Sequence, residues 1–73
     1  MFIFILNSSN MLIGKNGTVG HYKVIATSCT ISNNLQRVAD KVKEEFGLTL
    51  DITNGTTSDP ETFLSIENVP FLG

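Results

Sequence analysis

The feature that most limits the possible folds of this chain is an amphipathic helix near its middle. Apolar residues recur there at the spacing of a single helical stripe: Leu35, Val38, Ala39, Val42 and Phe46. Gly47 follows directly, and glycine is the usual residue where a helix ends in a left-handed conformation. The sequence therefore predicts a helix from about Asn33 to Phe46 with one apolar and one polar face.

Strand-like segments lie on both sides of this helix. The stretch from Tyr22 to Thr27 is rich in strand-forming residues, and Leu48 to Ile52 alternates apolar and polar residues. A strand, a helix and a strand joined by short loops predict a right-handed crossover between two parallel strands. We expect a strand–helix–strand (βαβ) unit from about Lys23 to Ile52 at the centre of an α/β fold.

The N-terminal part of the chain predicts a β-hairpin in front of that unit. Residues 2–6 form a continuous apolar run typical of a buried strand, and residues 7–10 have the composition of a turn. Asn16-Gly17 is a strong turn signal, because both residues tolerate positive φ. We expect a hairpin at Asn16-Gly17 with its returning strand from Thr18 onward.

The C-terminal part predicts a short helix and an apolar end. Ser58 and Glu61 match a capping box with Pro60 in the first turn, so a short helix carrying Phe63, Leu64 and Ile66 is expected. The run from Val69 to Leu72 suits an edge of a sheet, because Pro70 cannot donate to a ladder. Residues 1–73 are thus predicted to form a single small α/β domain.

Composition and charge narrow the classes of partner. The chain is 41% hydrophobic and 16% charged, which excludes intrinsic disorder. Its formal charge is −2, and its basic residues are spread along the sequence without a dense patch, so we expect no nucleic-acid partner. No apolar run approaches the roughly 20 residues of a membrane span. With Cys29 as the one cysteine there is no intrachain disulfide, and a cytoplasmic location is expected.

Catalytic and metal-binding sets are missing from the sequence. His21 is the one histidine, and together with Cys29 it supplies too few ligands for a transition metal. Asp59 and Glu61 are explained as residues at a helix start. The sequence leaves open whether the chain is an enzyme and favours a protein that is not one.

The loop from Ser28 to Asn34 is the candidate ligand site. It carries hydroxyl, thiol and carboxamide groups at the start of a helix, where free amides and the helix dipole favour a phosphate group. The same residues also suit a turn and a helix cap, which is the more frequent role. Both interpretations stay open from the sequence.

The segment Thr30-Ile31-Ser32-Asn33-Asn34-Leu35 resembles the phosphate loop of flavodoxins, whose pattern is S/T-x-T-G-N-T before an amphipathic helix. The end of the chain, to Leu72-Gly73, is similar to the segment leading into the third flavodoxin strand. The resemblance covers residues 23–73, the N-terminal βαβ half of that fold. It implies an FMN-type cofactor held by Thr30, Ser32, Asn33 and Asn34, in a module that is not a complete electron carrier alone.

Two other functions compete with this one. The first is a non-enzymatic interaction module that regulates or inhibits a partner protein, or that associates with itself, through edge-to-edge pairing of its apolar ends, Met1–Leu6 and Val69–Leu72. The second rests on Cys29, because Cys29-Thr30-Ile31-Ser32 is similar to the C-x-x-S pattern of monothiol thioredoxin-like proteins. For Cys29 itself, the sequence favours a buried and chemically inert thiol over a reactive one.

Overall fold

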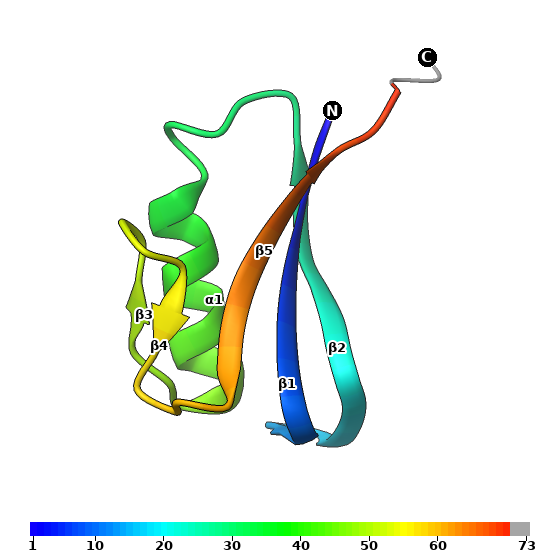
Figure 1. The fold of residues 1–73 in the computed structure, drawn as a ribbon, viewed down its shortest axis with the longest axis vertical. Coiled ribbons are helices and arrows are strands. Elements are labelled where there is room, and N and C mark those ends of the chain that lie inside the picture. Colours follow the sequence, from blue (N-terminus) through cyan, green and yellow to red (C-terminus); the bar gives the residue numbers. More distant parts are fainter. Residues whose placement is uncertain (71–73) are drawn as a thin grey trace.

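The computed structural model describes residues 1–70 and shows one helix packed on a five-stranded antiparallel sheet (Figure 1). The elements in chain order are β1 (Phe2–Gly14), β2 (Gly17–Ser28), α1 (Leu35–Phe46), β3 (Leu50–Asp51), β4 (Thr56–Thr57) and β5 (Thr62–Asn68). The strand order in the sheet is β2-β1-β5-β4-β3, and every neighbouring pair is antiparallel.

The predicted βαβ fold class is therefore wrong. Because neighbours alternate in direction, β2 and β3 do run the same way, but they lie at opposite edges with three strands between them. The chain passes from one edge to the other through α1 without forming a parallel pair. The local pattern of strand, helix and strand was present, but it did not reveal that β1 and β5 would lie between the two strands.

The hairpin predicted at Asn16-Gly17 is confirmed, with β1 paired to β2 in the register Phe4↔Ala26 and Leu6↔Lys23. Gly17 has φ 124°, a conformation that L side chains rarely adopt. The turn predicted at residues 7–10 is wrong, because β1 continues through it. An irregular register between Asn7 and Leu12 accommodates this polar stretch within the strand.

The predicted C-terminal helix is wrong, because the segment that should contain it forms strand β5. It pairs with β1 over Phe2↔Asn68 to Ser8↔Thr62. Thr62 and Leu64 are buried and Phe63 between them is exposed, which is the two-residue period of a strand. The Ser58–Glu61 pattern instead forms a turn, in which the Glu61 amide donates to Asp59 Oδ1 at 3.0 Å. Val69 and Pro70 lie outside any strand, and the remainder of the predicted apolar edge lies outside the described residues.

The core fills the space between α1 and one face of the sheet. It consists of Phe4, Leu6, Leu12, Ile25, Val38, Val42, Leu50 and Leu64. The predicted helical stripe is confirmed, since Val38 and Val42 are fully buried. The predicted end is confirmed as well, because Gly47 has φ 71° and donates its amide to the carbonyl of Lys43 at 3.0 Å.

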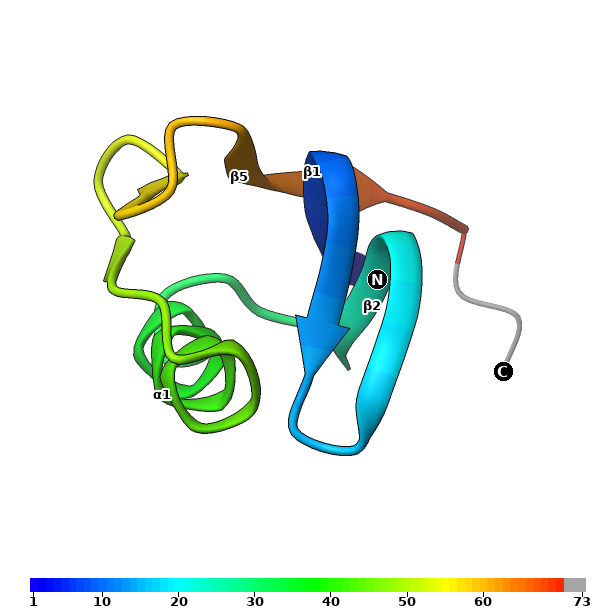
Figure 2. The same cartoon turned by 90° about the horizontal axis from the view of Figure 1, so that it is seen from below.

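The opposite face of the sheet carries no helix or strand within the described residues (Figure 2). Residues paired across antiparallel strands share a face, which places Asn7, Tyr22 and Phe63 together there. Tyr22 is 66% exposed and Phe63 52% exposed. Aromatic side chains of β2 and β5 are thus open to solvent on either side of the half-buried Asn7 of β1.

Candidate functional site

The loop that the sequence favoured forms a closed network of its own. The Asn34 amide group donates to Ser28 Oγ at 2.7 Å and to Thr30 Oγ1 at 3.0 Å. The Thr30 backbone amide donates to Ser28 Oγ at 3.1 Å, and the Asn34 and Leu35 amides donate to the carbonyl of Ile31. Several groups that a phosphate would use are therefore already bonded within the loop.

The other predicted loop residues stay apart from this network. Ser32 and Asn33 are exposed, and in residues 1–70 neither side chain makes a hydrogen bond. Cys29 is exposed, so the expectation that its thiol is buried is wrong. The structure brings Thr30 and Asn34 together, but it does not gather the four predicted cofactor residues around one space.

A second candidate is the outer edge of β2. This strand has 12 residues and, within residues 1–70, pairs with β1 alone, so no other strand occupies its outer edge. In an antiparallel edge strand, alternate residues point their amide and carbonyl groups away from the sheet. The opposite edge of the sheet is much shorter, because β3 has two residues.

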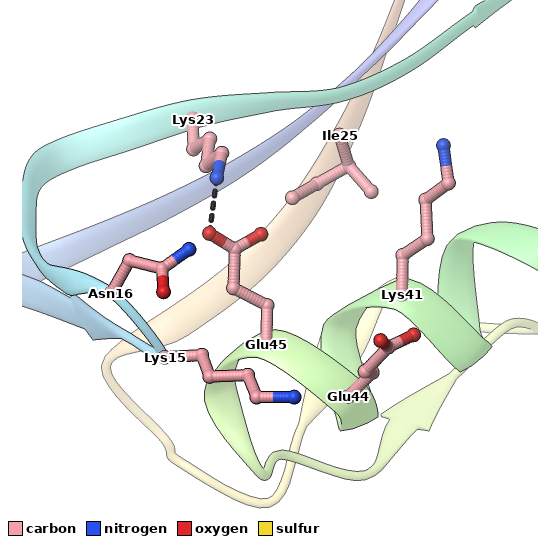
Figure 3. A pocket seen from close by; sticks show the side chains of 7 residues that line it. All are labelled: Lys15, Asn16, Lys23, Ile25, Lys41, Glu44 and Glu45. Carbon is pink, nitrogen blue, oxygen red and sulfur yellow. Dashed lines mark hydrogen bonds and ion pairs between the residues drawn. The ribbon is translucent and has the colours of Figure 1, made fainter.

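Two adjoining hollows lie between β2 and α1. One of about 400 Å³ is lined mainly by Lys15, Lys23, Ile25, Lys41, Glu44 and Glu45. Figure 3 shows Lys23 and Ile25 reaching from β2 toward α1, with Glu45 reaching back from the helix. The second, of about 440 Å³, is lined by residues 24–27 of β2 and by Asn34, Arg37 and Lys41. Because both include Ile25 and Lys41, we describe them together as the β2–α1 groove.

The groove collects most of the positive charge of the chain. Four of the five cationic residues line it, namely Lys15, Lys23, Arg37 and Lys41, against two carboxylates. The rest of the chain carries one lysine and five carboxylates. The molecule is therefore polarised, with a formal surplus of two positive charges in the groove and four negative charges elsewhere.

One ion pair fixes the inner wall of the groove. Lys23 Nζ bonds to Glu45 Oε1, and it lies 6.0 Å from the centroid of the Phe46 ring, at the limit of a cation–π contact. Since Glu45 neutralises Lys23, the cations left for a ligand are Lys15, Arg37 and Lys41. All three are exposed.

Sequence reasoning missed this site because its cations come from three different elements. Lys15 lies in the hairpin turn, Lys23 in β2, and Arg37 and Lys41 in α1. The one local signal was the spacing of Arg37 and Lys41, which places residues four apart on the same helix face. Basic residues that are spread along the sequence therefore come together in the folded protein.

Neither a metal cluster nor a membrane span accompanies this site in the described chain. Within residues 1–70, no three His, Cys, Asp or Glu side chains gather as a metal site would need. Over the same residues, α1 lacks the length and the apolar character that a helix needs to cross a membrane.

Comparisons with known proteins add no relative to this picture. A scan against protein-family models found no match, and searches of the curated proteins and of the solved structures found none either. Kinship with flavodoxins, and FMN at Thr30 to Asn34, stay predictions from the sequence.

Proposed function

We propose that the protein is a non-enzymatic interaction module that binds an extended segment of a partner protein by strand addition along β2. The observation that carries this proposal is the free outer edge of β2, which extends over 12 residues. In strand addition, main-chain hydrogen bonds supply affinity and alternate side chains supply specificity.

Most protective features of an exposed edge are missing from β2. Proteins usually keep such edges short, interrupt them with proline or β-bulges, cover them or place charges on them. β2 is long and contains no proline, and its lysine, Lys23, is already paired with Glu45. It does carry an irregularity at Ile25, between the paired residues Val24 and Ala26, so an added strand would pair on either side of that residue. The strand is therefore able to accept another strand.

The solvent-exposed face of the sheet would extend the contact beyond the backbone. Tyr22 and Val24 of β2 are 66% and 48% exposed. Their cross-strand partners on β1, Asn7 and Ile5, are half-buried and continue the same face. A partner strand beside β2 would place alternate side chains next to Tyr22 and Val24, and burial of that apolar surface favours binding.

The edge of β2 supports a function better than the predicted phosphate loop does. A flavin or phosphate at Thr30 to Asn34 would have to displace the bonds that Asn34 makes to Ser28 and Thr30. Residues 18–27 of β2 make no backbone hydrogen bond outside the sheet that an added strand would have to displace. An FMN titration with Asn34→Ala as control still tests the loop, since saturable quenching of flavin fluorescence would identify it as a flavin site.

Selection from a displayed library of random peptides, each as long as β2, tests the proposal. We expect enriched peptides to have alternating strand-forming residues, and their binding to shift the NMR signals of β2. Val24→Ser, which removes apolar surface from the exposed face of β2 without adding charge, should weaken binding. Ile52→Ser is the matched control, because Ile52 is an exposed apolar residue in the turn at the opposite edge.

Backbone methylation of the enriched peptide separates strand addition from other modes. In an added strand, alternate residues donate their amides to β2 and the others face away. Methylating one alternate set of amides should abolish binding, and methylating the other set should leave it nearly unchanged. Equal effects of the two sets, or failure to enrich any strand-forming peptide, would show that the proposal is wrong.

A further inference from the structure

We infer that the segment bound at β2 is acidic, with carboxylates on the side of the added strand that faces α1. This inference rests on the proposed function and names the chemistry of the partner. It starts from the position of the β2–α1 groove, which includes four consecutive residues of β2 and so lies along the edge of that strand.

The geometry of an added strand fits the cations of the groove. Side chains two apart on a strand share a face and are separated by about 6.6–6.8 Å. Arg37 and Lys41 are four apart on α1, which corresponds to about 6 Å along the helix axis. Both α1 and β2 run along the long axis of the molecule (Figure 1). Two alternate carboxylates on the added strand therefore match the spacing of Arg37 and Lys41.

Charge decides between an acidic partner and a second copy of this chain. Antiparallel pairing of β2 with β2 of another copy would bring two grooves together, each with a surplus of positive charge. Such like charges repel across an interface. An acidic segment meets the groove with opposite charge and is also attracted to it at longer range.

Glu44 lies on the same helix with a negative charge, so its substitution should have the opposite effect on the binding of an acidic peptide. It lines the same hollow as Lys15 and Lys41 and is exposed, so it repels a bound carboxylate. Glu44→Gln should therefore tighten the binding of an acidic peptide, whereas Arg37→Gln and Lys41→Gln should weaken it. Glutamine matches Glu44 in length, and it keeps the helix propensity at all three positions.

The experiment compares enriched peptides from the same library with synthetic versions in which each Glu or Asp is replaced by Gln or Asn. Affinities are measured by fluorescence anisotropy at low salt. An exposed ion pair is worth a factor of about two to five in affinity. We expect the acidic peptide to bind about threefold to tenfold more tightly than its neutral version. The difference should disappear when salt is raised from about 0.02 M to about 0.5 M.

The matched control is Lys43→Gln. Lys43 carries the same charge on the same helix but lines neither hollow, so its substitution should leave peptide affinity unchanged. The double variant Arg37→Gln, Lys41→Gln should remove most of the preference for the acidic peptide. Circular dichroism checks that each variant is folded.

The outcomes separate this inference from the function on which it rests. Strand-forming peptides that bind equally well in acidic and neutral form would overturn the acidic partner and leave strand addition standing. A dimer of the protein that competes with the peptide would assign the edge to a second copy. If no strand-forming peptide is enriched, the proposed function fails and the inference fails with it.

Discussion

Two glycines have almost the same backbone conformation but differ in how closely other atoms surround them. Gly47 and Gly55 have φ of 71° and 73°. A Cβ added at Gly47 would meet no atom within 4 Å, whereas one at Gly55 would lie 3.0 Å from the carbonyl oxygen of Leu64. The same stretch of β5 donates the Leu64 amide to the carbonyl of Gly55 at 2.6 Å. The turn after β3 therefore needs glycine for space as well as for conformation.

This difference predicts unequal costs for the same substitution. Gly47→Ala should lower the free energy of unfolding by about 1 kcal/mol, the usual cost of a left-handed alanine. Gly55→Ala should cost about 2 kcal/mol or more, because the Leu64 carbonyl must also shift. Urea denaturation of the two variants measures both values. Equal losses would show that the contact with Leu64 does not constrain this turn.

Two carboxyl groups with a lowered pKa should make the folded protein less stable in acid. The side-chain amide of Asn54 and the backbone amide of Thr53 donate to the Asp51 carboxylate, which lowers its pKa below the ordinary 3.8. The pKa of Asp59 is lowered by the Glu61 amide and the Thr62 hydroxyl. A depressed pKa in the folded state adds stability above the unfolded pKa, and that stability is lost as pH falls through the folded value.

The free energy of unfolding should therefore be constant near neutrality and fall as pH drops below about 4. Asp51→Asn should be less stable than the parent at neutral pH and should lose less stability on acidification. Chemical denaturation at a series of pH values gives both quantities. A parallel acid dependence of variant and parent would remove Asp51 as a contributor.

At the scale of elements, β1 is the centre of the molecule. It is hydrogen-bonded on both sides, to β2 and to β5, and it supplies Phe4, Leu6 and Leu12 to the core. Its partner β5 lies far along the chain, with Leu6 opposite Leu64. The N-terminal apolar run is thus the strand around which the others assemble, and the expectation that it forms an edge open to a partner is wrong.

A proline within β1 should accordingly disrupt the whole fold. Ile5 pairs with Val24 on one side and with Ser65 on the other, so Ile5→Pro removes an amide from a fully paired strand. We expect a loss of about 3 kcal/mol or more. Ile5→Thr keeps the amide and the strand propensity and is the control. A cooperative thermal transition near that of the parent in Ile5→Pro would contradict the central position of β1.

The sequence predicted correctly those elements that depend on residues close together in the chain, and it failed for those that depend on distant residues. The stripe of α1, its end at Gly47 and the turn at Asn16-Gly17 depend on neighbours in the chain, and they were predicted correctly. β5 was predicted as a helix, because Ser58, Pro60 and Glu61 suit a helix start as well as a turn. Its strand state depends on pairing with β1, which no local pattern encodes.

The candidate site shows the same dependence on range. The loop at Thr30 to Asn34 was conspicuous because its polar residues are consecutive, and the structure shows that several of them bond to one another. The sequence did not predict the groove, because its cations come from a turn, a strand and a helix. Only the packing of α1 beside β2 brings them together.

At the scale of the whole molecule, the two edges and the two faces of the sheet are unequal. One edge is the 12-residue β2, and the other is the two-residue β3. One face is covered by α1 (Figure 2), and the other carries the exposed side chains of Tyr22, Val24 and Phe63. The free edge, the basic groove and part of the apolar face all adjoin β2. This concentration of unpaired features on one strand is the basis of the functional proposal.

Amide hydrogen exchange along β2, with and without an enriched peptide, tests this account most directly. In the free protein, alternate amides of β2 should be protected by β1 and the others should exchange rapidly. The account predicts that the rapidly exchanging set becomes protected when the peptide binds, while the amides of β3 do not change. A peptide that binds and leaves exchange along β2 unaltered would contradict it.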